Sequence, residues 1–237
     1  MKKKTSPAAL EVRKSKEAER ILERLNSFLD KTEPEASYFL TRMWGDQKKA
    51  ITYKELRGAI LRGEIDEETI QAWQEDYAHF VEETLKPLWV RAMETATEEL
   101  AAKYPDYLFD PMHKEIINWI NENGARWVTN TAQAQKEAMQ AMISHAYSGA
   151  WTVDELSRAI RPLIGLNKIQ ANANLNYYLH IKESLLENNP TMRIATAEKR
   201  AKEAALKYAG TQHRQRAYTI ATTEMAFAYN KGAYEGV

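Results

Sequence analysis

The stretch from Asp66 to Leu100 constrains the fold more than any other part of the sequence, because apolar residues recur at helical spacing along its whole length. They are Ile70, Trp73, Tyr77, Phe80, Val81, Leu85, Leu88, Trp89, Met93, Ala96 and Leu100. Asp66 is a favourable N-cap, and Pro87 predicts a kink or break in the run. No stretch shows convincing strand alternation, and nine glycines and seven prolines in 237 residues are few for a fold with many turns. The sequence therefore predicts an all-α fold, an elongated assembly of long amphipathic helices.

Local signals predict where the other helices begin and end. Capping boxes mark three starts, at Thr52 with Glu55, at Thr152 with Glu155 and at Asn167 with Gln170. A further start is predicted at Asp110-Pro111, and ends or turns are predicted at Glu33-Pro34, Gly45-Asp46 and Gly210. The expected division is a basic N-terminal arm and amphipathic helix (1–35), a helical domain with a long acidic-faced helix (36–150) and a C-terminal helical module (151–237).

Charge is unevenly distributed, although 33 basic residues balance 33 acidic ones. Residues 64–83 hold eight acids and no Lys or Arg, which gives −8, whereas residues 193–216 hold seven bases and two acids, which gives +5. The acidic block is expected to be mostly the solvent face of one helix. We therefore expect the two regions to meet different partners.

Composition and spacing exclude several classes of function. Without cysteine, the chain has no disulfides, thiolate metal sites or Cys nucleophiles. No two of the five histidines are close enough in sequence for a typical metal site, and neither a Gly-rich phosphate loop nor a serine nucleophile elbow is present. No signal-peptide core and no membrane-length apolar window occur. We therefore expect a soluble, non-exported protein with no membrane association, no metal, no cofactor and no enzyme activity.

Basic residues near the C-terminus form the first candidate site, for nucleic acid. They are Arg193, Lys199, Arg200, Lys202, Lys207, Arg214 and Arg216. Such residues on a helix can lie along phosphates, where each neutralised phosphate adds about 0.9 to the salt slope of binding. The alternative is a solvated helix face stabilised by the pair of Glu203 and Lys207 at i, i+4.

Aromatic residues in a region expected to be irregular form the second candidate site. Tyr38, Phe39 and Trp44 lie close together there, and aromatic anchors dominate the energetics of many protein interfaces. We therefore expect a partner-docking patch at these three residues. The tryptophans on the regular apolar stripes of the long helices are instead expected in the core.

Glu224 interrupts an apolar stripe of the last predicted helix. The stripe consists of Ala217, Ile220, Ala221, Phe227 and Ala228. Burial of a lone carboxylate is costly, so a paired and hydrogen-bonded one is expected. Arg216 is about 12 Å away along the helix, which favours a base from a neighbouring helix: Arg158, Arg161 or Arg200. We interpret Glu224 as a structural clamp whose replacement by Gln lowers the melting temperature, with a catalytic acid as the alternative.

The C-terminal third resembles a known family. The resemblance rests on "WTVDELSRAI" (151–160), "IGLNKIQANANLNYYLHI" (164–181) and "RAYTIATTEMAFAYNKGAYEGV" (216–237). An Ile-Gly-Leu turn, a helix, a basic helix, Arg-Ala, Ile-Ala, Thr-Glu and an Ala-x-Asn-x-Gly ending resemble the phage head morphogenesis family, the minor capsid proteins similar to the F protein of phage Mu. Arg216 and Glu224 are the charged members of this motif. Residues 1–150 show no such resemblance.

This resemblance implies a minor head protein of a tailed phage or prophage. Its expected partners are the portal protein, other capsid or scaffold proteins and double-stranded DNA, and its expected location is the host bacterial cytoplasm during assembly and then the virion. Family members commonly have Arg where this chain has Thr222, and they continue past the position of Val237, so a truncated product is expected. Two alternatives stay open: a helical DNA-binding protein that uses residues 193–216, and a toxin-like transferase, for which the chain lacks room and strands.

Overall fold

The computed structural model describes residues 16–103, 109–148 and 152–235, and within these ranges every regular element is helical. The elements are α1 (Lys16–Ala50), α2 (Tyr53–Arg62), α3 (Glu67–Phe80), the π-helical turn η1 (Val81–Leu85), α4 (Lys86–Lys103), α5 (Lys114–Ser148), α6 (Val153–Ile160), the 3-10 turn η2 (Arg161–Leu163), α7 (Lys168–Asn188) and α8 (Ile194–Glu235). The predicted all-α fold is confirmed. The predicted basic arm at residues 1–15 lies outside the described residues.

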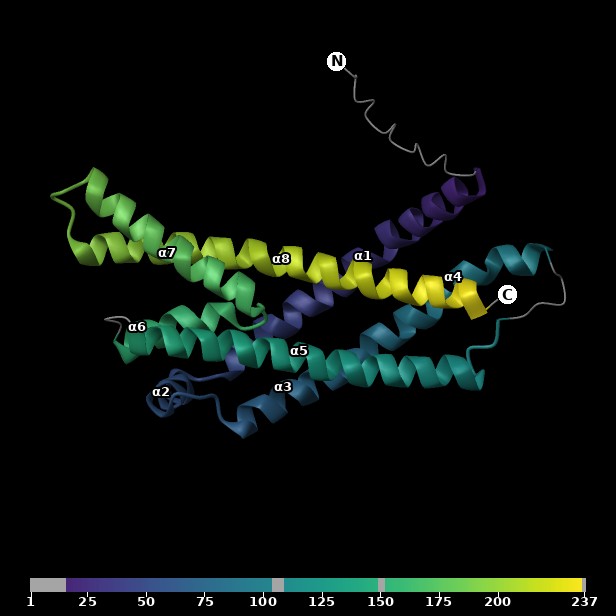
Figure 1. The fold of residues 1–237 in the computed structure, drawn as a ribbon, viewed down its shortest axis with the longest axis horizontal. Coiled ribbons are helices and arrows are strands. Elements are labelled where there is room, and N and C mark those ends of the chain that lie inside the picture. Colours follow the sequence, from purple (N-terminus) through teal and green to yellow (C-terminus); the bar gives the residue numbers. More distant parts are fainter. Residues whose placement is uncertain (1–15, 104–108, 149–151, 236–237) are drawn as a thin grey trace, which may run out of the picture.

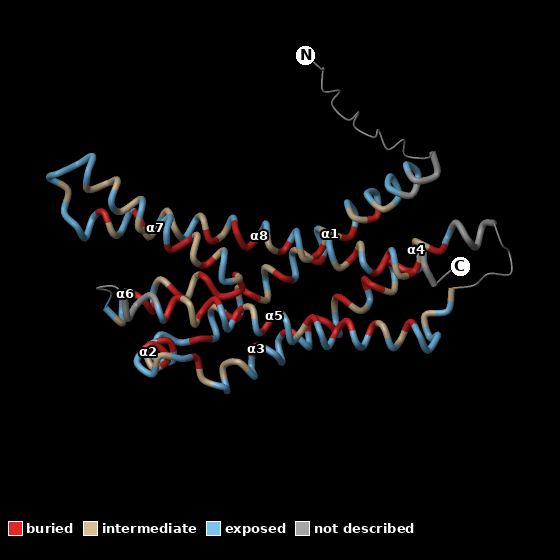
Figure 2. Tube along the Cα trace, in the orientation of Figure 1, coloured by how far each residue is buried: buried red, intermediate tan, exposed pale blue. Residues whose placement is uncertain are grey.

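The molecule is elongated, with α5 and α8 running along its long axis and α1 crossing obliquely behind them (Figure 1). Helix α8 packs on α7 with its N-terminal half and on α1 and α4 with the rest, while α5 packs on α3 and α7. Buried residues line the inner sides of these helices (Figure 2). One hydrophobic core joins residues from all three predicted segments, such as Phe28, Trp89 and Ala217.

Helix α1 is longer than the sequence predicted, because it continues through Pro34 and Gly45. A row of buried residues spaced by four crosses the proline without interruption: Phe28, Thr32, Ala36, Leu40 and Trp44. A proline inside a helix costs roughly 3 kcal/mol, whereas burial of a Phe or Leu side chain contributes about 1.5–3 kcal/mol each. Packing of this row therefore outweighs the proline, and the breaks predicted at Glu33-Pro34 and Gly45-Asp46 are wrong.

The helical stretch that begins after Asp66 is deformed near Pro87 but does not end there. The side chain of Asp66 accepts a hydrogen bond from N of Thr69, which confirms the predicted N-cap. The π-helical turn at residues 81–85 lies directly before Pro87. Pro87 has no N–H to donate, and a widened turn is a common way for a helix to accommodate a missing bond in its ladder. The predicted disturbance at Pro87 is therefore confirmed as a π-turn ahead of it.

The three capping boxes are confirmed, but two other boundaries differ from the sequence prediction. Thr52, Thr152 and Asn167 each accept a hydrogen bond from the backbone N of the third helical residue. At Asp110, however, the side chain accepts from N of Met112 and α5 begins only at Lys114. Helix α8 also continues through Gly210, because tertiary packing on both sides of the glycine holds one ladder together.

Candidate functional site

The Ile-Gly-Leu turn of the resemblance folds directly over the indole of Trp44. Gly165 has φ +90°, a left-handed conformation that favours glycine, and a Cβ at this position would overlap the Trp44 ring. Trp44 itself is fully buried. The prediction that Trp44 belongs to a docking patch is therefore wrong, because α1 carries it into the core instead of ending in an irregular segment.

A chain of hydrogen bonds runs inward from Trp44. Nε1 of Trp44 donates to Oη of Tyr77 at 3.1 Å, and that hydroxyl donates to Oε1 of Gln135 at 2.6 Å. Nε2 of Gln135 then donates to Oε1 of Gln47 at 3.3 Å. Burial raises the pKa of Tyr77, so the phenol stays protonated and can donate. These contacts join α1, α3 and α5 through polar groups inside an apolar core.

His213 and Lys48 meet on the other side of Trp44. Nζ of Lys48 lies 3.5 Å from Nδ1 of His213, and the ring nitrogens lie 2.6 Å from O of Ala209 and 2.7 Å from O of Ile164. Burial and the Lys48 ammonium lower the pKa of His213 to about 4, and burial lowers the pKa of Lys48 to about 8. The ring is therefore neutral at pH 7, where its one N–H can serve only one of the two carbonyls.

Arg216 points into the core and not outward with the other bases. Its guanidinium carbon lies 5.8 Å from the centre of the Trp44 ring, and burial lowers its pKa. Nε of Arg216 is buried and has no hydrogen-bond partner within the described part of the chain. The structure therefore corrects the assignment of Arg216 to a nucleic-acid surface: its cation stacks on an internal aromatic ring.

Five of the predicted nucleic-acid residues are exposed, namely Arg193, Lys199, Arg200, Lys207 and Arg214. Lys202 is half-buried. On α8, Arg200, Lys207 and Arg214 are seven residues apart, which places them on one side of the helix along a line of about 21 Å. The structure thus brings three of the seven predicted residues into one row.

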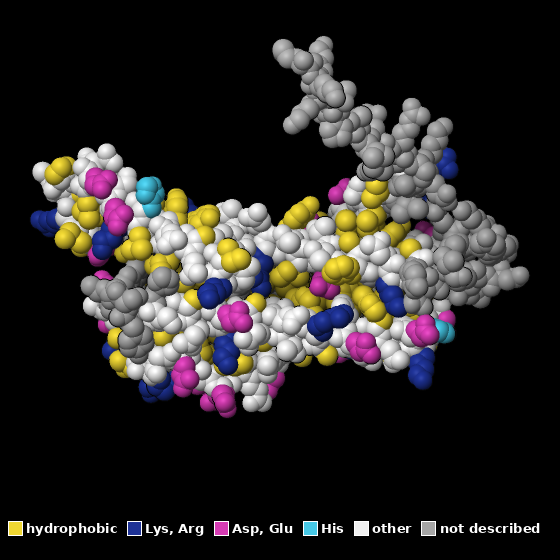
Figure 3. Space-filling view, in the orientation of Figure 1, with side chains coloured by type: hydrophobic (Ala, Val, Ile, Leu, Met, Phe, Trp, Pro, Cys, Tyr) yellow, Lys and Arg dark blue, Asp and Glu magenta, His cyan; other side chains and the backbone are white. Residues whose placement is uncertain are grey.

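Glu224 reaches α5, and not one of the bases expected to pair with it. Its Oε2 accepts a hydrogen bond from Nδ2 of Asn123 at 3.2 Å, and Oδ1 of Asn123 accepts from Arg126 at 2.9 Å. Burial raises the pKa of Glu224, which the Asn123 hydrogen bond and the Arg126 charge only partly oppose. Hydrophobic side chains gather on this face of the molecule in the strip between α8 and α5 (Figure 3).

The three bases predicted as partners of Glu224 lie elsewhere, so this pairing is wrong. Arg161 donates to the backbone oxygens of Lys48 and Lys49 and stacks over the Tyr53 ring at 4.8 Å. Arg158 and Arg200 are exposed. The sequence offered no signal for the Asn123 contact, because 101 positions separate the two residues.

Tyr38 and Phe39 stay exposed on α1, at 59% and 37% of their surface, and their rings meet edge to face with centroids 5.5 Å apart. Without Trp44, the predicted docking patch is reduced to this pair, and its role stays a prediction.

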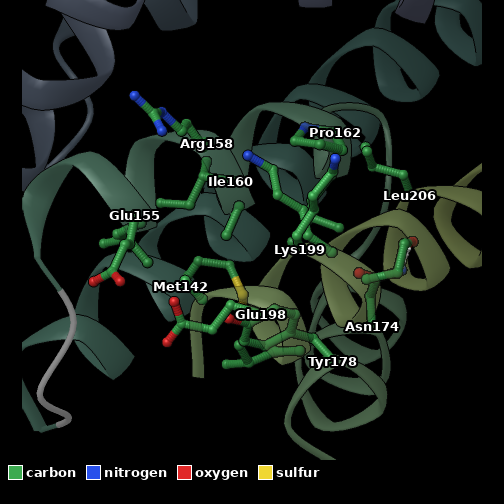
Figure 4. Close-up of a pocket in the computed structure, with 17 residues that line it drawn as sticks. Met142, Glu155, Arg158, Ile160, Pro162, Asn174, Tyr178, Glu198, Lys199 and Leu206 are labelled. Atoms are coloured by element: carbon green, nitrogen blue, oxygen red, sulfur yellow. Dashed lines mark hydrogen bonds between the residues drawn. The ribbon is translucent and has the colours of Figure 1, made fainter. Parts of the chain in front are cut away.

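A pocket of about 370 Å³ opens where α6, α7 and the N-terminal half of α8 meet (Figure 4). Buried Leu156, Ile160 and Leu163 line it, together with Met142 from α5 and the exposed Leu206 from α8. We call it the α6–α8 groove. The sequence carries no distinct signal for this groove. Its apolar lining comes from four helices, and in each of them the apolar residues follow the pattern expected of core residues.

Charged side chains surround the α6–α8 groove. Arg158 from α6 and Lys199 and Lys202 from α8 lie around it, as do Glu155 and Glu198. Nζ of Lys182 donates to Oε1 of Glu198 at 2.7 Å, and this bond raises the pKa of Lys182. Arg158 and Lys199 reach toward one side of the pocket in Figure 4, and the two carboxylates lie toward the other.

Comparison of the sequence with models of known protein families, with curated proteins and with solved structures gives no significant match. Among the described residues, no helix combines the length and apolar character needed to cross a membrane. In the same ranges, no cluster of three or more His, Cys, Asp or Glu residues could hold a metal ion.

Proposed function

We propose that this chain is a structural protein of phage head assembly, a minor head protein that docks to the portal inside the procapsid. The proposal rests on the resemblance of residues 151–237. It draws support from the role that the resembling residues have in the fold.

The residues that carry the resemblance pack helices against each other. Gly165 admits the Trp44 ring, and Ala217 and Ala221 are fully buried on α8. A Cβ on Gly232 would lie 2.5 Å from Cα of Met93, so this glycine lets α8 and α4 approach closely. These small residues at helix contacts are the structural observation that supports the proposal, because they fix how closely the helices of the motif pack.

Co-expression with a portal protein of the same phage or prophage tests the proposal. Size-exclusion chromatography with light scattering at moderate salt is expected to show a co-eluting complex of defined mass. Elution of the two proteins as separate peaks, with this chain folded by circular dichroism, would contradict portal docking.

A helical DNA-binding protein is the second candidate function. The row of Arg200, Lys207 and Arg214 on the exposed side of α8 favours it, because cations in a row along a helix can follow phosphates. Salt dependence of binding to duplex DNA separates this function from portal docking.

A further inference from the structure

We propose that the α6–α8 groove binds a short segment of a partner protein in which apolar side chains stand next to acidic residues. The partner's identity as a head protein rests on the function proposed above, whereas the chemistry of the segment follows from the groove alone. The apolar lining, the free charges and the exposed apolar rim each support one part of this proposal.

The lining selects apolar side chains. Leu156, Ile160 and Leu163 are buried to 3% exposure or less and form the floor, and Pro162 and Leu175 extend it. A volume of about 370 Å³ lies within the range of roughly 300–1,000 Å³ typical of binding pockets. The space suits a few side chains from one short segment, and burial of each would contribute about 1.5–3 kcal/mol before the entropy of ordering is subtracted.

The charges around the groove select acidic residues beside those side chains. The two acids are already engaged: Glu155 closes the capping box with Thr152, and Glu198 pairs with Lys182. Within residues 16–103, 109–148 and 152–235, no acid lies within ion-pair distance of any of the three bases, Arg158, Lys199 and Lys202. The groove thus offers its ligand three bases without an acid partner, and they outnumber Glu155, a lining acid that no ion pair in these ranges offsets.

Exposed apolar side chains on the N-terminal half of α8 favour a protein segment over a small amphiphile. Leu206, which lines the groove, is 44% exposed, and Ile194, next to the lining residue Ala195, is 61% exposed. A small molecule inside the pocket would contact Leu206 but would leave Ile194, whose side chain does not line the pocket, in water. A protein segment can cover them and the central pocket together, as interfaces with a buried anchor and a surrounding rim do.

Fluorescence anisotropy with the full chain and three labelled ten-residue peptides tests the proposal. The first peptide combines Leu and Phe with flanking Asp and Glu, the second has Lys in place of the acids, and the third has Ser in place of the apolar residues. Only the first is expected to bind saturably, with an affinity that falls as salt increases. Equal binding of the second or third peptide, or no saturable binding of the first, would overturn the proposal.

Two double variants of α8 locate the binding. Lys199→Glu with Lys202→Glu reverses the charge at the groove and is expected to weaken the first peptide at least about tenfold, or about 1.4 kcal/mol. Arg200→Glu with Lys207→Glu makes the same change in net charge on exposed residues that do not line the groove, and is expected to leave most of the affinity. Equal losses of affinity in the two variants would show that the effect is general electrostatics, and would contradict binding of the peptide in the groove.

Further measurements separate the occupant and the function from the groove. Ile194→Ser is expected to weaken the peptide, and dodecanoate at matched ionic strength is expected to compete poorly. Strong competition by dodecanoate with no effect of Ile194→Ser would indicate a small amphiphile instead. Portal co-elution that survives Lys199→Glu with Lys202→Glu would contradict the groove as the binding site of the portal and leave the proposed function standing. Peptide binding without portal co-elution would contradict only the proposed function.

Discussion

Gly165 and Trp44 form a close contact between the C-terminal part of the chain and α1, because the absence of a side chain on the glycine lets the indole lie against the turn. The same indole donates to Tyr77 and stacks with Arg216 and His213. One aromatic residue therefore connects the Ile-Gly-Leu turn with α3 and α8. Four predictions test this arrangement and the surfaces around it.

Replacement of Gly165 by Ala is expected to destabilise the protein by about 2–5 kcal/mol. A left-handed backbone costs a non-glycine residue roughly 1–2 kcal/mol, and overpacking against Trp44 adds about 1–3 kcal/mol. Denaturant unfolding followed by circular dichroism measures the change. Gly45→Ala is the matched control: no atom lies within 4 Å of its Cβ position inside α1, so this variant should gain up to about 1 kcal/mol. A similar response of the two variants would contradict the close packing at Gly165.

Replacement of Glu224 by Gln is expected to leave the melting temperature at pH 7 unchanged or higher, which reverses the expectation drawn from the sequence. Burial raises the folded-state pKa of Glu224 above its unfolded value, so the ionised form reduces stability at neutral pH and protonation restores it as the pH falls. Gln removes this charge and can still accept from Asn123. Melting curves of the variant should lose the part of the pH dependence that comes from Glu224. A clear drop in melting temperature would contradict this prediction and support the interpretation of ionised Glu224 as a structural clamp.

Stability is expected to fall between about pH 6.5 and pH 4 because of His213. Its folded pKa of about 4 lies below the unfolded value of 6.5, so the unfolded chain binds the proton first as the pH decreases. The shift corresponds to a loss on the order of 3 kcal/mol, complete near pH 4. His213→Gln should remove this part of the pH profile in urea unfolding, whereas exposed His79→Gln should not. A profile unchanged by His213→Gln would contradict the burial of a neutral ring.

Duplex DNA binding by the exposed row on α8 would have a defined salt signature. Replacement of Arg200, Lys207 and Arg214 by Ala is expected to reduce the slope of log K against log salt by about 2.7, at 0.9 per phosphate contact. Arg216→Ala should instead lower the melting temperature, because this side chain stacks on Trp44 inside the protein. Filter binding or anisotropy across a salt series measures the slope. An unchanged slope in the triple variant would eliminate the row as a DNA surface.

The sequence predicted the helical class and the starts of helices well, because capping depends on residues three positions apart. Thr52, Thr152 and Asn167 show this directly. It predicted helix ends poorly at Pro34 and Gly210, where local propensity opposes the helix and distant packing restores it. The row of buried residues spaced by four across Pro34 was a signal available in the sequence, and it would have placed Trp44 in the core.

The candidate sites were harder to predict, because they depend on contacts between distant segments. Trp44 and Tyr77 are 33 positions apart, and Lys48 and His213 are 165 apart. The basic stretch 193–216 looked uniform, yet the structure divides it into an exposed row, a groove wall and the internal Arg216. Only the rotation of α8 against its neighbours decides which base faces outward, and composition carries no information on that rotation.

Helix α8 is one uninterrupted helix along the long axis of the molecule. Its 42 residues correspond to about 63 Å of continuous hydrogen-bonded ladder, with the α6–α8 groove near one end and the close contact of Gly232 with α4 near the other. Gly210, the position where the sequence suggested a joint, lies inside the ladder. The groove and the close contact with α4 therefore lie on one uninterrupted helix, which also packs on α1 between them.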